Sequence, residues 1–128
     1  MGPCYKLCLL IDDNFIDNFV TRKILENGSF AEKIVVYQSA TEAVAALKNQ
    51  TVIPDVIFLD IRMPLMDGFA FLDEYDKLSI QGKEDIKIFM LSSSLDPVDF
   101  RMSTQNKYIT QFLHKPITHK VLEGICSW

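Results

Sequence analysis

The sequence predicts an α/β fold in which a five-stranded parallel sheet is covered by helices on both faces. Two observations support this prediction. Short apolar runs alternate along the chain with segments of helical period, and runs such as residues 56–59 and 88–91 are apolar at every position. Strands that are buried on both faces have this pattern, whereas half-exposed strands alternate apolar and polar residues. Strands alternating with helices favour a parallel sheet.

The elements follow in a regular order. The predicted strands are residues 6–11, 34–38, 55–59, 86–91 and 108–113. Helices are predicted over residues 14–27, 39–48, 68–78 and 117–125, with a further helix whose first turn includes Pro97. Gly28 stands where a helix ends, and Ser39 with Glu42 forms a capping box. The residues of the first helix that we expect to face the core are Phe15, Phe19, Ile24 and Leu25.

Composition narrows the class of protein. The 128 residues suit a single domain, residues 1–128, and 48% of them are hydrophobic. A net charge of −4 argues against nucleic acid as a partner and disfavours an anionic membrane surface. None of the three cysteines, Cys4, Cys8 and Cys126, belongs to a C-x-x-C pair, which favours a reduced chain. We therefore expect a cytoplasmic protein.

Polar side chains follow four of the predicted strands. Asp12 and Asp13 follow the first strand, Asp60 the third, Ser92 the fourth and Lys115 the fifth. In open parallel sheets the ligand crevice lies outside the carboxyl ends of the strands. These three carboxylates, one hydroxyl and one ammonium are therefore expected to converge.

Each of these groups also has an ordinary structural interpretation. Asp12 or Asp13 can cap the first helix, and residues 92–94 can form a simple serine-rich loop. Lys115, which precedes Pro116, can be a solvated turn residue. For any one of them alone, the sequence leaves this alternative open.

Together the groups indicate a phosphate site that depends on Mg²⁺. Three carboxylates at one edge repel one another unless a cation or a proton relieves them, and Mg²⁺ prefers oxygen ligands of this kind. A lysine ammonium and a serine hydroxyl suit the oxygens of a phosphoryl group. Asp60 then has the position of a nucleophile that forms an acyl phosphate.

The chain resembles the receiver domains of two-component response regulators, of the stand-alone chemotaxis type. The motifs that carry the resemblance are LLIDDN at residues 9–14, VIFLDIRMPLMDG at residues 56–68, a hydroxyl residue ending the fourth strand, and Lys-Pro after the fifth. The resemblance covers residues 6–125. It implies the flavodoxin-like, doubly wound (βα)5 fold with strand order 2-1-3-4-5.

The resemblance also implies a role for each site residue. Asp60 would be the phosphoacceptor, and Ser92 and Lys115 would contact the phosphoryl group. Ser92 and Phe112 would be the switch residues. The implied Mg²⁺ ligands are Asp12, Asp13, Asp60 and the backbone carbonyl of Arg62. The implied modulators of acyl-phosphate lifetime are Arg62 and Ser94.

A sensor histidine kinase or a histidine phosphotransfer protein is the implied phosphodonor, and the downstream protein target is unknown. The resemblance implies a signalling domain that assists its own phosphorylation and dephosphorylation, and not an enzyme with a separate substrate. Whether it is a terminal regulator or a shuttle in a phosphorelay, and a monomer or a phosphorylation-dependent dimer, stays open.

Two other functions share part of this pattern. A phosphatase of the haloacid dehalogenase type needs a second aspartate two residues after the nucleophile, but Asn14 follows Asp12 at that spacing and Arg62 follows Asp60. A receiver-like binding module that is never phosphorylated would keep the fold and usually lose one of the five site residues. All five are of a competent type here.

Overall fold

The computed structural model describes residues 2–94 and 96–126. Within these residues the chain forms a single five-stranded sheet, and every pair of neighbouring strands is parallel. The strands are β1 (Tyr5–Ile11), β2 (Ala31–Tyr37), β3 (Val56–Asp60), β4 (Lys87–Ser92) and β5 (Ile109–His114). Their order is β2-β1-β3-β4-β5, so the predicted flavodoxin-like topology is confirmed.

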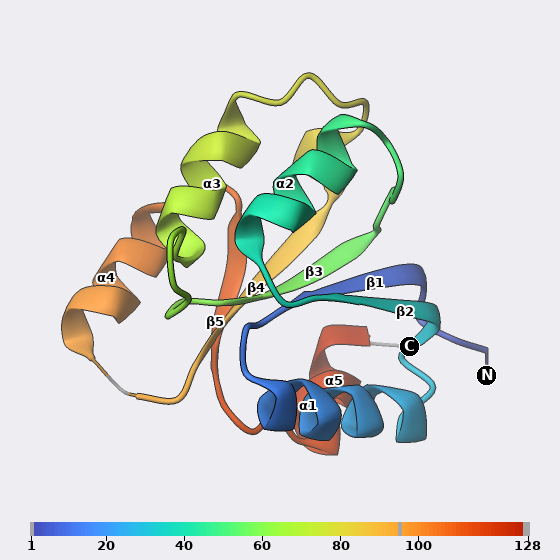
Figure 1. Cartoon of the computed structure of the whole chain (residues 1–128). Helices are drawn as coiled ribbons and strands as arrows, with labels where there is room; N and C mark the ends of the chain where they lie inside the picture. The colour runs from blue at the N-terminus through green and yellow to red at the C-terminus, as the bar shows by residue number, and fades with distance from the viewer. Residues whose placement is uncertain (1, 95, 127–128) are drawn as a thin grey trace.

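Helices cover both faces of this sheet (Figure 1). The α-helices are α1 (Phe15–Asn27), α2 (Ala40–Lys48), α3 (Gly68–Asp76), α4 (Pro97–Gln105) and α5 (His119–Cys126). Helices α1 and α5 lie below the sheet in the view of Figure 1, and α2 and α3 lie above it. Each side has its own buried cluster: Leu9, Leu59 and Phe71 belong to one, and Leu10, Phe58 and Leu122 to the other. Alternate residues of β1 and β3 therefore serve opposite clusters.

Local hydrogen bonds explain where the helices begin. Ser39 Oγ accepts from the backbone N–H of Glu42 at 3.3 Å, as the predicted capping box requires, and Asp67 caps α3 in the same way. Pro97 is the first residue of α4. The predicted element bounds differ from the observed ones by no more than three residues. A short 3-10 helix, Lys83–Asp85, was not predicted.

The prediction that Phe15 and Phe19 face the core is wrong. Their side chains are 72% and 58% exposed, and the buried residues of α1 are Asn18, Thr21 and Leu25. The amide of Asn18 donates to the carbonyl of Asp12 at 2.7 Å, which turns this face of the helix towards the sheet. At about 100° per residue, Phe15 and Phe19 then point about 60° and 100° away from Asn18.

The start of β1 and the end of α5 lie at the same side of the molecule (Figure 1). Cys4 precedes β1 and Cys126 ends α5, and their sulfurs form a disulfide. The prediction of a fully reduced chain is therefore wrong at these two positions. Cys8 is a free, buried cysteine of β1. No helix within the described residues is long and apolar enough to cross a membrane.

Candidate functional site

The site lies at the carboxyl edge of the sheet. Asp12 directly follows β1, Asp60 is the last residue of β3, Ser92 is the last residue of β4, and Lys115 directly follows β5. The four strands are parallel neighbours, so these ends meet at one edge. The Lys115 backbone N–H donates to the carbonyl of Ser92 at 2.7 Å, which keeps the ends of β4 and β5 together.

The Lys115 ammonium connects three carboxylates. Its Nζ lies 2.8 Å from Asp12 Oδ2, 2.8 Å from Asp17 Oδ2 and 3.1 Å from Asp60 Oδ1. The Lys115 side chain is only 9% exposed, so it is not the solvated turn residue of the alternative interpretation. The convergence of Asp12, Asp60 and Lys115 expected from the strand ends is therefore what the structure contains.

Asp17 was not predicted as part of this cluster. It lies in the first turn of α1, where acidic residues are common because they face the positive end of the helix dipole. Because an acidic residue is ordinary at this position, there was no separate reason in the sequence to expect that Asp17 contacts Lys115. Because α1 starts directly after the end of β1, a residue in its first turn remains beside the strand end, and this spacing is the signal that could have identified Asp17.

The predicted acidic cluster is compact. Oxygen atoms of Asp12, Asp13 and Asp60 all lie within 4.8 Å of one another. Asp12 and Asp60 are buried, and Asp13 is exposed, so the group opens to solvent on one side. Three carboxylates around an open position fit Mg²⁺, which binds through a few carboxylates and keeps several waters.

The surroundings of Asp60 disfavour the ionised form of its carboxyl group. Burial, followed by repulsion from the Asp12 carboxylate, raises the pKa of Asp60 to about 6, although Lys115 opposes this effect. Burial alone would lower the pKa of Lys115, but its hydrogen bonds to Asp12 and Asp17 raise it above the usual value for lysine. Lys115 therefore stays charged, and a second cation near Asp60 and Asp13 would relieve the remaining repulsion.

Asp12 is held in place by the start of α1. Its Oδ1 accepts from the backbone N–H of Asn14 at 3.0 Å, and its backbone carbonyl accepts from Asn18. The N-cap of α1 is Asn14, whose side chain accepts from the N–H of Asp17. Neither Asp12 nor Asp13 is the helix cap of the alternative interpretation.

The remaining predicted residues make contacts of their own. Ser92 Oγ donates to the carbonyl of Ser94 at 2.8 Å and accepts from its N–H at 3.1 Å, so its hydroxyl is engaged within its own loop. Phe112 of β5 is half-buried, with its ring edge-to-face against Phe100 of α4. The Arg62 side chain reaches Asp99 of α4, a buried acid that was not predicted.

The loop after Asp60 is tightly packed against the strand. The Gly68 N–H donates to the carbonyl of Ile61 at 2.8 Å, and a Cβ added at Gly68 would lie 2.7 Å from the carbonyl oxygen of Asp60. Only glycine fits this approach.

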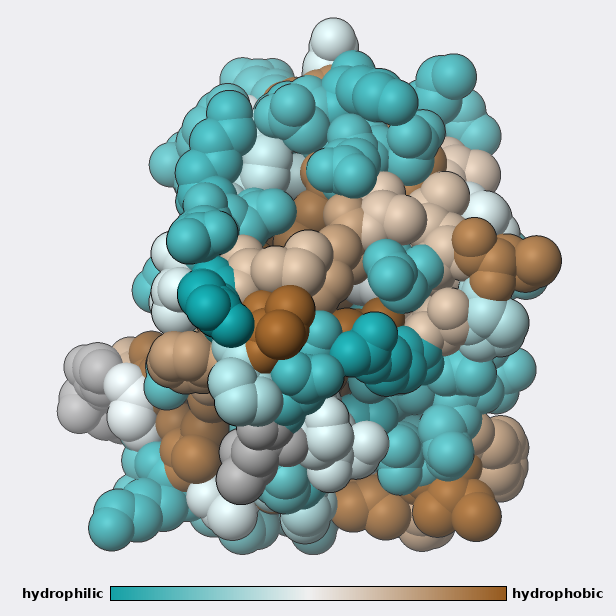
Figure 2. Space-filling model, turned by 90° about the vertical axis from the view of Figure 1, so that its left-hand side faces the viewer, coloured by the Kyte–Doolittle hydropathy of each residue, from teal (hydrophilic) through white to brown (hydrophobic). Residues whose placement is uncertain are grey.

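Figure 2 shows the end of the molecule to which α4 and the carboxyl ends of the strands belong, where hydrophilic and hydrophobic surface are mixed.

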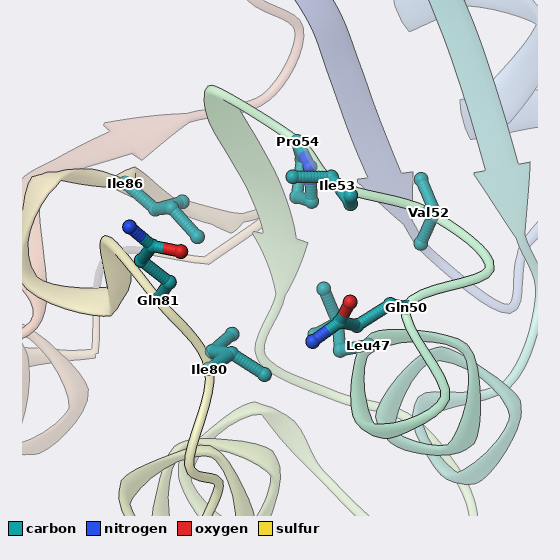
Figure 3. Close-up of a pocket in the computed structure, with 8 residues that line it drawn as sticks. All are labelled: Leu47, Gln50, Val52, Ile53, Pro54, Ile80, Gln81 and Ile86. Atoms are coloured by element: carbon teal, nitrogen blue, oxygen red, sulfur yellow. The ribbon is translucent and has the colours of Figure 1, made fainter.

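A separate cavity lies at the opposite edge of the sheet (Figure 3). It has a volume of about 280 Å³ and lies between the end of α2, the segment before β3 and the segment before β4. Its lining is Leu47, Gln50, Val52, Ile53, Pro54, Ile80, Gln81 and Ile86. This lining contains two amide side chains and no charged one, unlike the carboxylate and ammonium groups at the carboxyl edge.

Comparison with known proteins agrees with the geometry. A family model of the response regulator receiver domain matches residues 8–126. The sensor histidine kinase CheAY of Helicobacter pylori is 29% identical over 124 residues, which cover 97% of this chain and 15% of that protein. A two-component response regulator from Cytophaga hutchinsonii superposes with a TM-score of 0.85 at 28% identity, over 95% of this chain and 94% of that one.

A receiver protein from Dyadobacter fermentans has a TM-score of 0.81 at 30% identity, over 93% of this chain and 96% of that chain. The chain spans less than half the length of the first curated relatives that it matches, with 15%, 29% and 45% of those proteins covered. Since the family model extends over almost all of the sequence and the solved relatives share the whole fold, the chain belongs to the response regulator receiver domain family.

Proposed function

We propose that residues 1–128 form a single receiver domain that accepts a phosphoryl group on Asp60 in two-component signal transduction. Receiver domains bind Mg²⁺ at an acidic pocket and work with histidine kinases or phosphotransfer proteins. The observation that carries the proposal is the convergence of Asp12, Asp60 and Lys115, with the Lys115 ammonium 2.8 Å and 3.1 Å from the two carboxylates.

Asp60, Lys115 and Ser92 have different roles in the proposed phosphoryl transfer. Asp60 is the nucleophile: one carboxylate oxygen forms a bond to the phosphorus of a phosphohistidine, while the P–N bond breaks and its electron pair returns to the imidazole nitrogen. Because the pKa of Asp60 is about 6, most of this carboxylate is ionised and able to attack at neutral pH. Lys115 neutralises charge on the transferred group, and Ser92 donates to one of its oxygens once it releases Ser94.

The metal would be held by Asp12, Asp13, Asp60 and the backbone carbonyl of Arg62. When bound, Mg²⁺ neutralises charge on the phosphoryl oxygens during the transfer. The carboxylates themselves support this assignment. Burial and then the neighbouring Asp12 charge raise the pKa of Asp60, and a divalent cation would offset the effect of that charge.

The partner that donates the phosphoryl group is proposed to be a sensor histidine kinase or a histidine phosphotransfer protein. Exposed apolar residues on α1 support a protein partner beside the site, since Phe15, Ile16 and Phe19 lie within five residues of Asp17 and Asn14 at the site's edge. Brown surface also gathers at the bottom of Figure 2, the side of the sheet on which Figure 1 places α1 and α5.

Phosphorylation is proposed to act through Ser92 and Phe112. Movement of Ser92 towards the phosphoryl group and an inward turn of Phe112 would repack the surface of α4, β5 and α5, on which the unknown downstream target or a second copy would bind. Arg62 and Ser94, beside Asp60 and Ser92, are proposed to tune how long the acyl phosphate survives.

The test is incubation with a small phosphodonor such as acetyl phosphate and Mg²⁺, followed by intact mass spectrometry. The wild-type protein should gain one phosphoryl group, and Asp60→Asn should gain none. An equal adduct on the variant, or no adduct on the wild type, would contradict the phosphoacceptor assignment and favour a binding module. Size-exclusion chromatography of the two forms then reports whether phosphorylation drives dimerisation.

A further inference from the structure

Arg62 joins the loop after the phosphoacceptor to the first turn of α4. Its Nη2 lies 2.5 Å from Asp99 Oδ2 and 3.8 Å from Asp96 Oδ2. Asp96 is the N-cap of α4 and Asp99 lies in its first turn, so both acids mark the start of the helix. The guanidinium therefore fixes the start of α4 relative to the backbone two residues beyond Asp60.

The two acids differ in burial, and therefore in how strongly each depends on this cation. The Asp99 side chain is 6% exposed, whereas that of Asp96 is 42% exposed. Within the described residues, the Asp99 carboxylate accepts one hydrogen bond, and its donor is Arg62. A buried carboxylate that loses its partner must regain water or a proton, so separating Arg62 from Asp99 would favour movement of the start of α4.

The same helix start is connected to Ser92. The Ser92 hydroxyl donates to the carbonyl of Ser94 and accepts from its N–H, and Ser94 precedes the α4 N-cap by two residues. For Ser92 to donate to a phosphoryl group on Asp60, its bond to the Ser94 carbonyl must break. Because Ser94 stands two residues before the N-cap of α4, a shift of the helix start can alter its contact with Ser92.

The far side of α4 contacts the other predicted switch residue. The rings of Phe100 and Phe112 pack edge-to-face with centroids 5.6 Å apart. Phe100 is the residue after Asp99, so one turn of α4 contacts both the loop after Asp60 and the side chain of Phe112. A shift of this turn would change the packing of Phe112 directly.

We propose that Asp99 is a positioning residue whose ion pair with Arg62 holds α4, Ser92 and Phe112 in the arrangement of the unphosphorylated protein. This inference rests on the proposed function of Asp60 as phosphoacceptor. When the ion pair is removed, the equilibrium shifts towards the phosphorylated arrangement, and a phosphoryl analogue binds more tightly because more of the protein is already competent.

Beryllofluoride with Mg²⁺, a non-covalent analogue of the phosphoryl group, is the probe. Its dissociation constant is measured by ¹⁹F NMR titration for the wild type, Asp99→Asn and Arg62→Gln. Both variants should bind it more tightly, by about 3- to 10-fold if the competent fraction rises correspondingly. The double variant should be no tighter than the single ones, because both changes remove the same contact.

Asp96→Asn is the matched control, because this exposed acid also faces Arg62 but at 3.8 Å. It should bind like the wild type. In the metal-free protein without beryllofluoride, the Ser92 and Phe112 resonances of Asp99→Asn should lie part-way towards their positions in the wild-type complex, a shift that mere loss of stability does not produce. Arg62→Gln replaces an exposed side chain, and it provides the same comparison if Asp99→Asn does not fold.

The outcomes separate this inference from the function on which it rests. Wild-type protein that binds beryllofluoride, with folded Asp99→Asn and Arg62→Gln that bind it equally or more weakly, would overturn the role of Asp99 alone. Wild-type protein that binds no beryllofluoride would overturn the phosphoacceptor function, and the role of Asp99 with it.

Discussion

At the scale of single residues, the surroundings of Asp60, the proposed phosphoacceptor, destabilise the fold while its carboxylate is ionised. The Asp60 carboxylate is buried beside Asp12, and the Lys115 ammonium offsets only part of the resulting repulsion. A carboxylate whose pKa is higher in the folded protein than in the unfolded chain destabilises the fold whenever it is ionised. Titratable groups with perturbed pKa values often cluster at functional sites, where the surrounding structure holds them together.

Asp60→Asn should therefore stabilise the metal-free protein in a manner that depends on pH. The wild-type pKa is about 6 in the folded state and 3.8 as the ordinary value, so the folded protein binds the proton more tightly and wild-type stability falls as pH rises between these values. Near pH 3.5 the variant and the wild type should unfold alike. Above pH 7 the variant should be more stable by about 1–3 kcal/mol.

Urea unfolding in EDTA at a series of pH values measures this difference. A stability gain that is the same at pH 4 and pH 7.5 would show that loss of the Asp60 charge is not its cause. The control Asp73→Asn changes an exposed acid of α3, and it should show no comparable dependence on pH.

Mg²⁺ should stabilise the wild-type protein, and Asp13→Asn should abolish most of this effect. Asp13 is exposed, so the change should alter metal-free stability by no more than about 0.5 kcal/mol. For a ligand that binds only the folded state, stability rises by about 1.4 kcal/mol at a concentration ten times the dissociation constant. Thermal unfolding with 0 and excess Mg²⁺ gives the comparison, and an equal rise in both proteins would exclude Asp13 as a ligand.

At the scale of elements, periodicity predicted which segments are helices better than which face of each helix is buried. In α1 the largest side chains suggested the buried face, but the hydrogen bond from Asn18 to Asp12 sets the rotation of the helix and leaves Phe15 and Phe19 exposed. A buried polar contact between a helix and a strand end depends on the tertiary structure, so the pattern of apolar residues alone could not reveal it.

Gly68 is an element-scale requirement of the loop after β3. Gly68→Ala should destabilise the protein by about 1–3 kcal/mol, because its Cβ would press on the backbone of Asp60 and Ile61. The matched control is Gly124→Ala in α5, where an added Cβ meets nothing within 4 Å and should stabilise the helix by up to about 1 kcal/mol. Urea unfolding of the two variants measures both signs. An unchanged free energy of unfolding in Gly68→Ala would contradict the claim that this position requires glycine.

At the scale of the whole molecule, topology explains why so much of the site could be predicted. Parallel strands bring Asp12, Asp60, Ser92 and Lys115 to one edge whatever the details of their loops, so their positions in the sequence were sufficient. The positions of the strand ends alone do not identify Asp17 and Asp99, although the short connection from β1 to α1 could have indicated Asp17. They reach the site from the first turns of α1 and α4, and their contacts depend on how each helix packs.

The disulfide between Cys4 and Cys126 is also a property of the whole chain, because it joins residues 122 positions apart. Breaking it should lower the free energy of unfolding by about 2–4 kcal/mol, since the unfolded chain regains the freedom that the link removed. Urea unfolding with and without dithiothreitol measures this loss. The double variant Cys4→Ser/Cys126→Ser should not respond to the reductant. A wild type that also fails to respond would contradict the predicted stabilisation by this link.

The location of the phosphoryl group tests the central claim most directly. After treatment with acetyl phosphate and Mg²⁺, borohydride reduction converts an aspartyl phosphate into homoserine, whose position is read by fragmentation of the peptides in a mass spectrometer. The account predicts homoserine at position 60, dependent on Mg²⁺ and greatly reduced in Lys115→Gln. Homoserine at Asp12 or Asp13, or a phosphoryl group found on a serine with position 60 unchanged, would contradict it.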